Sequence, residues 1–105
     1  MKEAVIVAAT RTPIGRAFKG SLVECRPDDL TALIVKSLLE KTPGLEASAI
    51  EDLIVGCAQP AGESGYNIAR AISVVAGLPD VPGTTVNRYC ASSLQAVRMA
   101  AHAIK

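Results

Sequence analysis

TTVNRYCASSLQAVRMAAHAI, residues 84–104, changes from strand-forming to helix-forming residues within a few positions. The β-branched residues at its start favour an extended strand over about residues 84–89. Positions 90–104 are rich in Ala, Leu, Gln and Met, which favour a helix. Because no Gly or Pro separates the two parts, the sequence predicts an abrupt strand-to-helix junction with Cys90 on it.

The same alternation of a short apolar run and a helix-period segment occurs twice before this stretch. Residues 4–9 are apolar on both alternating faces, as in a strand covered on both sides of a parallel sheet, and a helix is expected from Pro27 to about Lys41. A second strand is expected over residues 52–58 and a second helix over residues 67–76. The chain therefore predicts an α/β fold of βαβαβα order with a mostly parallel sheet.

Helical periodicity also predicts which faces of the helices are buried. In the first helix, the expected buried stripe is Leu30, Leu33, Ile34, Leu38 and Leu39. In the second helix, the expected inward residues are Ile68, Ala71, Ile72 and Val75. In the last helix, one polar stripe is formed by Gln95, Arg98, His102 and Lys105. The rest of the last helix is apolar or small, so most of it is expected to be buried.

Two loops are candidates for ligand contact. The long loop of residues 10–26 holds Arg11, Arg16 and Lys19, which either approach an anionic ligand or are simply solvated. The second loop, residues 59–65, is rich in Gly and Pro and follows a predicted strand, where open α/β sheets bind ligands.

Composition and charge exclude several function classes. The net charge is +1 and acidic and basic residues are interspersed, which gives no support for nucleic-acid or membrane-surface binding. No apolar run approaches the roughly 20 residues of a membrane span. The N-terminus lacks the features of a secretory signal, so a cytoplasmic protein is expected.

The number and spacing of the cysteines favour a free, reactive thiol over a disulfide framework or a metal site. Cys25, Cys57 and Cys90 are widely spaced, with no Cys-x-x-Cys pair and a single histidine in the chain. Neither a disulfide framework nor a metal site is expected. Cys57 ends an apolar strand and is expected in the core, whereas Cys25 lies in a polar loop.

The predicted position of Cys90 suits a nucleophile. A helix N-terminus favours the thiolate form, and its unpaired backbone N–H groups can stabilise an oxyanion on an attached carbonyl. The pattern alone also fits an inert, small, buried cysteine at a helix start. Both interpretations stay open on this evidence.

Six stretches, taken in order, resemble the N-terminal part of thiolases over essentially the whole chain. They are residues 3–15, Gly56-Cys57, Gly62-Glu63, Asn67-Ile68-Ala69-Arg70, residues 81–87, and Tyr89 to Ala96. The resemblance implies a layered αβαβα fold, of which residues 1–105 are part of the N-terminal domain, apparently truncated at Lys105. It also implies a homodimer or a dimer of dimers. The similarity is greatest to degradative 3-ketoacyl-CoA thiolases and acetyl-CoA acetyltransferases, enzymes of fatty acid β-oxidation and lipid metabolism.

The resemblance implies ping-pong acyl transfer with coenzyme A as a substrate rather than a bound cofactor. Cys90 matches the family's acyl-carrying cysteine. Arg70 and Asn87 are expected to hold the loops around Cys90, and Gly62 and Glu63 to shape the pocket or a subunit contact. No residue here is assigned to coenzyme A binding.

The family's two histidines and its second catalytic cysteine belong to a later part of the family's chain, so these 105 residues alone are expected to be inactive. His102 is no substitute, because it lies three turns along the helix from Cys90, about 18 Å away. Two alternatives remain: a condensing enzyme of the ketoacyl synthase type, and a non-catalytic chain that depends on a partner.

Overall fold

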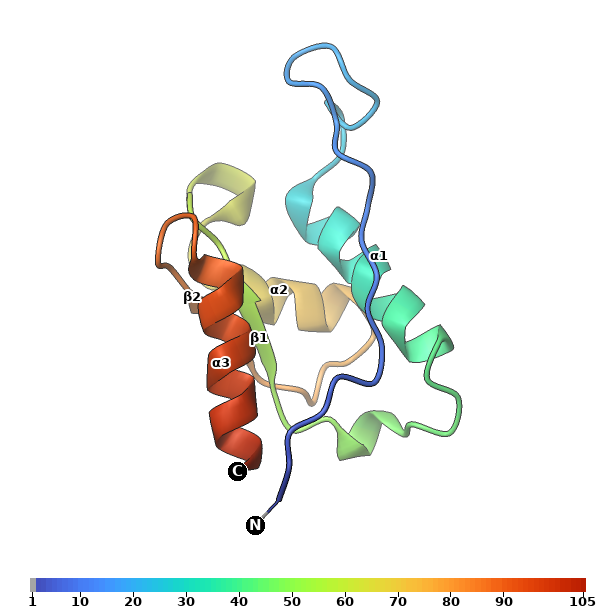
Figure 1. Cartoon of the computed structure of the whole chain (residues 1–105). Helices are drawn as coiled ribbons and strands as arrows, with labels where there is room; N and C mark the ends of the chain where they lie inside the picture. Colours follow the sequence, from blue (N-terminus) through green and yellow to red (C-terminus); the bar gives the residue numbers. More distant parts are fainter. Residues whose placement is uncertain (1) are drawn as a thin grey trace.

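The computed structural model describes residues 2–105 (Figure 1). The elements are α1 (Pro27–Glu40), β1 (Leu53–Gly56), α2 (Ile68–Val75), β2 (Gly83–Val86) and α3 (Ser92–Ile104), with two 3-10 turns, η1 (Ala47–Ala49) and η2 (Gly62–Ser64). The two strands pair in parallel, with Leu53 opposite Gly83 and Gly56 opposite Val86. The predicted α/β class with parallel strands is confirmed.

The two-stranded sheet lies between layers of helices (Figure 1). Alternate residues of β1 point to opposite faces, as a strand requires. Leu53 and Val55 pack with α1 and α2, and Cys57, just after the strand, continues that face. Gly56 meets the first turn of α3 on the other face. The expectation that Cys57 belongs to the core is confirmed.

The core is centred on α2, and its buried apolar residues are Ala32, Ile68, Ile72, Ala76, Leu78 and Val81. Ile68 and Ile72 were expected there, but Ala71 and Val75 are exposed, and Ala69 and Ser73 are buried in their place. The cause is a close approach to β2: a Cβ atom on Gly83 would lie 2.5 Å from the carbonyl carbon of Ala69. The buried face of α2 is therefore rotated about the helix axis relative to the predicted face.

The expected first strand, residues 4–9, is not formed within the part of the chain that the structure describes. The segment is extended but pairs with no strand, and Val5, Ile6 and Val7 are 70%, 83% and 77% exposed. It runs beside α1 (Figure 1), where Lys41 Nζ donates to Thr10 Oγ1 at 3.1 Å. A strand needs a neighbouring backbone to pair with, and this path offers none.

Helix α1 begins at Pro27 as predicted, and four of its five expected inward residues, Leu30, Ile34, Leu38 and Leu39, are half-buried. The fifth, Leu33, is 60% exposed, and the fully buried residue is Ala32, which was not predicted. The helix packs chiefly on α2.

Helix α3 departs further from its prediction. It begins at Ser92, two residues after Cys90, and of its residues only Ser92 and Ala96 are buried. Leu94 is 73% and Val97 56% exposed, so the expectation of a mostly buried helix is wrong for this chain. A sheet of two short strands covers only a small part of a helix surface.

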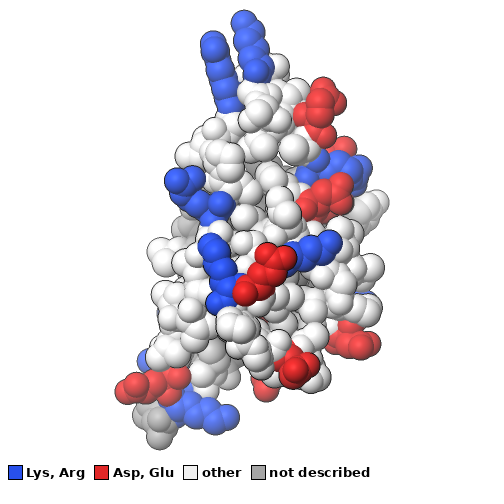
Figure 2. Space-filling model, turned by 90° about the vertical axis from the view of Figure 1, so that its right-hand side faces the viewer, with Lys and Arg blue, Asp and Glu red and all other residues white. Residues whose placement is uncertain are grey.

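Lysine, arginine and carboxylate side chains are interspersed over the face shown in Figure 2, in agreement with the net charge of +1. None of the helices within residues 2–105 has the length and apolar character needed to cross a membrane.

Candidate functional site

Residues 87–91 form the turn between β2 and α3, and Cys90 is exposed near its end. Tyr89 has φ +50°, the left-handed region that non-glycine residues rarely adopt and that costs on the order of 1–2 kcal/mol. The predicted junction at Cys90 is thus a real turn, with Ala91 between the cysteine and the first helical residue. The strained backbone sits directly beside the thiol-bearing residue.

Ser92 closes this turn from inside. Its hydroxyl donates to the Tyr89 carbonyl oxygen at 2.6 Å and accepts from the Arg88 N–H at 2.8 Å. The backbone N–H of Ser92 donates to the same Tyr89 carbonyl at 3.1 Å. The residue is 3% exposed, so these bonds are shielded from water.

Asn87 and Gln95 brace the same turn from outside. The Asn87 Oδ1 atom accepts the N–H of Tyr89 at 2.9 Å, and Arg88 Nη1 donates to Gln95 Oε1 at 2.6 Å. The expectation that Asn87 holds the loop around Cys90 is borne out by this contact. Asn87 and Ser92 therefore hold the backbone of residues 88–89, just before the thiol, and Gln95 holds the Arg88 side chain.

Gly56 determines where this turn sits on the sheet. A Cβ atom there would lie 2.4 Å from the backbone of Ser92 and Ser93, closer than atoms tolerate. Glycine thus allows the first turn of α3 to rest on the end of β1. Sequence reasoning gave Gly56 and Ser92 no role, although a glycine at a strand end and a serine at a helix start were available signals.

The start of α3 offers hydrogen-bond donors. The N–H groups of Ser93 and Leu94 reach no acceptor within residues 2–105, as expected at a helix N-terminus. Cys90 precedes this end instead of lying in its first turn. These donors lie three and four residues after Cys90 in the chain.

Arg70 does not contribute to the Cys90 turn, contrary to the sequence prediction. Its Nη1 atom donates to the carbonyl oxygens of Pro79 at 2.8 Å and Val81 at 3.1 Å and to Ser73 Oγ at 3.2 Å. Arg70 therefore fastens the loop that leads into β2. The motif around Arg70 thus stabilises the loop before β2, and β2 in turn leads to the turn that holds Cys90.

Asn67 directly precedes α2, but the side chain that caps this helix comes from β2. Thr85 Oγ1 accepts the N–H of Ala69 at 3.0 Å and donates to Asn67 Oδ1 at 2.7 Å. Asn67 Nδ2 in turn donates to the Gly83 carbonyl at 2.8 Å. These bonds tie the helix start to the strand that leads to Cys90.

Gly62 and Glu63, in η2, are tied to α1 and make no hydrogen bond to the turn of residues 87–91. Arg26 Nη1 lies 3.2 Å from Glu63 Oε1, and Arg26 Nη2 lies 3.0 Å from Asp28 Oδ2. The hydrogen bond from Arg26 holds the pKa of the Asp28 carboxyl below its ordinary value. The ion pairs fix the loop after β1 to the start of α1.

The remaining candidate residues are spread out. Cys25 is exposed, and Cys57 is half-buried with its Sγ 3.9 Å from the Ser64 carbonyl oxygen. His102 is exposed in the last turn of α3. The described part of the chain contains no group of three or more side chains able to hold a metal ion. The basic residues of the long loop, Arg11, Arg16 and Lys19, are likewise exposed.

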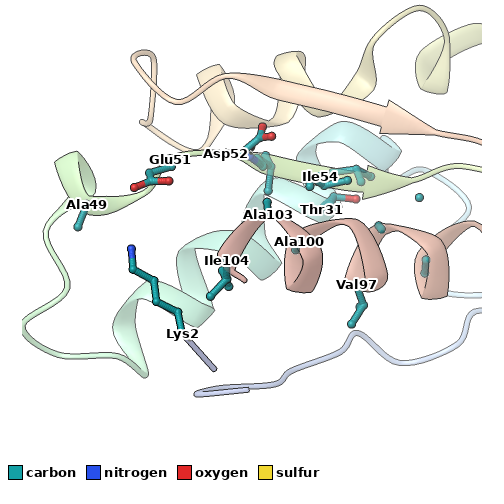
Figure 3. A pocket seen from close by; sticks show the side chains of 15 residues that line it. Lys2, Thr31, Ala49, Glu51, Asp52, Ile54, Val97, Ala100, Ala103 and Ile104 are labelled. Atoms are coloured by element: carbon teal, nitrogen blue, oxygen red, sulfur yellow. Dashed lines mark hydrogen bonds between the residues drawn. The ribbon is translucent and has the colours of Figure 1, made fainter. Parts of the chain in front are cut away.

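A hollow of about 890 Å³ lies between β1 and α3 (Figure 3). Apolar residues such as Ile54 and Ala100 line its length, and Lys2 and Glu51 lie at one end. Its lining includes Gly56 and Ser93 but not Cys90. The hollow is thus a neighbour of the turn and does not contain the thiol.

Residues 4–105 match the family model described as the thiolase N-terminal domain. The chain is 56% identical over 105 residues to a 3-ketoacyl-CoA thiolase of Bacillus subtilis, covering 99% of this chain and 27% of that protein. It is 50% identical over 106 residues to a beta-ketoadipyl-CoA thiolase of Acinetobacter baylyi, covering 100% of this chain and 26% of that protein. A 3-oxoadipyl-CoA/3-oxo-5,6-dehydrosuberyl-CoA thiolase of Escherichia coli matches equally, at 50% over 106 residues and 26% of its length. The chain spans about a quarter of the length of these relatives.

Proposed function

This chain belongs to the thiolase family, and on that premise we propose that it carries the acyl-accepting cysteine, Cys90, of an acyl-CoA C-acyltransferase. The observation that carries the proposal is the turn itself. An exposed thiol follows a left-handed residue whose backbone Asn87 and Ser92 hold, and it lies two residues before the first residue of α3. Such a geometry presents a nucleophile beside hydrogen-bond donors.

The reaction has two halves. The Cys90 thiolate attacks the 3-keto carbon of a 3-ketoacyl-CoA, and the keto oxygen becomes an oxyanion that backbone N–H groups at the start of α3 can stabilise. The oxyanion collapses, the bond between C2 and C3 breaks, and the C2 carbanion takes a proton to leave as acetyl-CoA. The thiolate of a second coenzyme A then attacks the acyl-cysteine thioester and releases Cys90.

The proton transfers need a general acid and base, and the described residues, 2–105, offer none in the turn that holds Cys90. His102 is in the last turn of α3, and the turn of residues 87–91 holds no carboxylate. We therefore expect this stretch alone to be inactive and the rest of the protein to complete the site. A homodimer or dimer of dimers and a cytoplasmic location are further parts of the proposal.

For the substrate we propose a 3-ketoacyl-CoA, and the relatives' names give two classes to compare. Relatives named 3-ketoacyl-CoA thiolase match this chain at 49–56% identity, and those named for 3-oxoadipyl-CoA or beta-ketoadipyl-CoA at 49–50%. Comparing kcat/KM for acetoacetyl-CoA, a longer 3-ketoacyl-CoA and 3-oxoadipyl-CoA separates these classes. Thiolysis with free coenzyme A also separates a thiolase from a condensing enzyme of the ketoacyl synthase type, which favours carrier-protein substrates.

The decisive experiment is to trap the acyl-enzyme. The full-length protein is mixed with acetoacetyl-CoA, quenched in acid and digested, and one acetyl group is expected on the peptide that contains Cys90. Cys90→Ser should lose both the label and thiolysis, whereas the matched control Cys25→Ser should keep both. An acetyl group on Cys25 or Cys57, or turnover by Cys90→Ser, would refute the proposal.

A further inference from the structure

Resting on the proposed function, we infer that Ser92 is a positioning residue that sets the geometry of Cys90 through the turn between them. Ser92 touches neither a reacting atom nor a substrate group in this proposal. Its effect passes through the two peptide groups that it binds, those of Arg88 and Tyr89.

Both hydrogen bonds of the Ser92 hydroxyl lie within this turn. One bond goes to the Tyr89 carbonyl at 2.6 Å and the other comes from the Arg88 N–H at 2.8 Å. Because the residue is 3% exposed, water cannot readily replace the hydroxyl if it is removed. An alanine would leave the Arg88 N–H without its partner and the Tyr89 carbonyl with one bond fewer.

These two peptide groups flank the strained position. Tyr89 stays at φ +50° only while its surroundings enforce that conformation. The Asn87 amide oxygen holds the Tyr89 N–H, and Ser92 holds the Tyr89 carbonyl. Loss of the Ser92 hydroxyl leaves the Tyr89 carbonyl with the Ser92 N–H alone and the Arg88 N–H without its partner, so the backbone of Tyr89 can relax and carry Cys90 with it.

The rest of the fold does not depend on these bonds. Helix α3 is also seated by Ala96, which is buried, and by the close approach of its first turn to Gly56. Removing the Ser92 hydroxyl should therefore change the local geometry at the thiol more than the global stability.

Ser73 supplies a matched control. It is a buried serine in α2 whose hydroxyl also makes two hydrogen bonds, donating to the Arg70 carbonyl at 2.9 Å and accepting from Arg70 Nη1 at 3.2 Å. Ser73→Ala and Ser92→Ala thus remove the same chemical group from equally buried sites. Only Ser92 adjoins the turn of Cys90.

The test measures kcat and KM for thiolysis of acetoacetyl-CoA, the melting temperature, and the rate of iodoacetamide alkylation of Cys90 relative to Cys25, all on the full-length protein. For Ser92→Ala we expect kcat to fall by roughly 10- to 100-fold, as a small misplacement of a reacting group can cause. KM should stay nearly unchanged and alkylation of Cys90 should slow relative to Cys25. Ser92→Thr, which keeps a hydroxyl, should recover most of the loss.

Ser73→Ala should lower the melting temperature and leave kcat and the alkylation ratio as in the unmodified protein. The inference is overturned if Ser92→Ala keeps kcat and the alkylation ratio, or if Ser73→Ala reduces them equally. Should Ser92→Ala fail to fold, Ser92→Cys keeps the side-chain volume with much weaker hydrogen bonds and is judged by the same kinetics.

The outcomes also separate this inference from the proposed function. Absence of an acyl-Cys90 in the unmodified protein refutes the function, whereas the alkylation ratio needs no turnover and still reports on the positioning by Ser92.

Discussion

At the scale of single residues, short polar side chains determine the local geometry of this protein. Asn87 and Ser92 hold the backbone of Tyr89 from its two ends, and Thr85 caps α2 from the neighbouring strand. Each places an oxygen within reach of a backbone N–H, which longer side chains do less reliably. The sequence could not reveal these roles, because its pattern does not distinguish a serine or threonine that hydrogen-bonds to the backbone of a turn from one that is exposed to solvent.

The ion pair between Arg26 and Asp28 predicts a pH dependence. The pKa of Asp28 is held below its ordinary 3.8 by the hydrogen bond from Arg26, so the folded state binds the proton more weakly than the unfolded chain. This stabilisation is complete above the ordinary pKa and is lost as the pH falls through the lowered pKa of the folded state. In thermal melts of the 105-residue chain from about pH 5 to about pH 2, the melting temperature of Asp28→Asn should fall less on acidification than that of the unmodified chain.

Asp29→Asn is the matched control, because Asp29 forms no ion pair within residues 2–105. An acid transition that is unchanged in Asp28→Asn would contradict this assignment.

At the scale of elements, two glycines let helices lie against strands. Gly83 allows α2 to pack closely on β2, and Gly56 allows α3 to pack closely on β1. At each glycine, a Cβ atom would lie 2.5 Å or less from the helix backbone. These contacts explain why the buried face of α2 was predicted wrongly. Periodicity finds a helix and its approximate ends, but the rotation of the helix depends on contacts with residues distant in sequence.

Gly56→Ala is expected to destabilise the fold by about 1–3 kcal/mol, because its Cβ must displace the first turn of α3. The same displacement should alter iodoacetamide alkylation of Cys90. Urea denaturation measures the first effect and mass spectrometry of the labelled peptides the second.

Gly83→Ala provides the comparison for Gly56→Ala, because it pushes on α2 by a similar amount and should be similarly destabilising. It should leave the reactivity of Cys90 unchanged. Equal effects of both variants on Cys90 would argue against a specific role of Gly56 in seating the turn.

The sequence predicted the existence of every helix and of both observed strands, and it placed the start of α1 at Pro27 correctly. It failed at residues 4–9, whose unbroken apolar run is typical of a strand covered on both faces, although they find no paired neighbour in the described chain. Cys90 lies between a strand and a helix as predicted, but β2 ends at Val86, three residues earlier than predicted, and α3 begins at Ser92, two residues later. The intervening turn was missed because it contains neither Gly nor Pro, and its left-handed residue is a tyrosine.

At the scale of the whole molecule, packing is concentrated on one side of the sheet. The α2 side holds the core cluster, including Ile72 at 0% exposure, whereas Leu94 on α3 is 73% exposed. In the 105-residue chain, Ile72→Ala should therefore cost about 2–5 kcal/mol, and Leu94→Ser should stay within about 0.5 kcal/mol. Urea denaturation of the two variants checks this contrast, and a large loss in Leu94→Ser would contradict the exposure of α3.

The braces of the Cys90 turn all lie close together in sequence. Hydrogen bonds among Asn87, Arg88, Tyr89, Ser92 and Gln95 span at most seven residues. The conformation of the turn thus depends on one short segment of the chain, whereas its position on the sheet depends on Gly56, more than thirty residues earlier. Because these two determinants are separate, the segment should keep its conformation when it is transplanted between a strand and a helix of another protein that has a glycine at the matching contact.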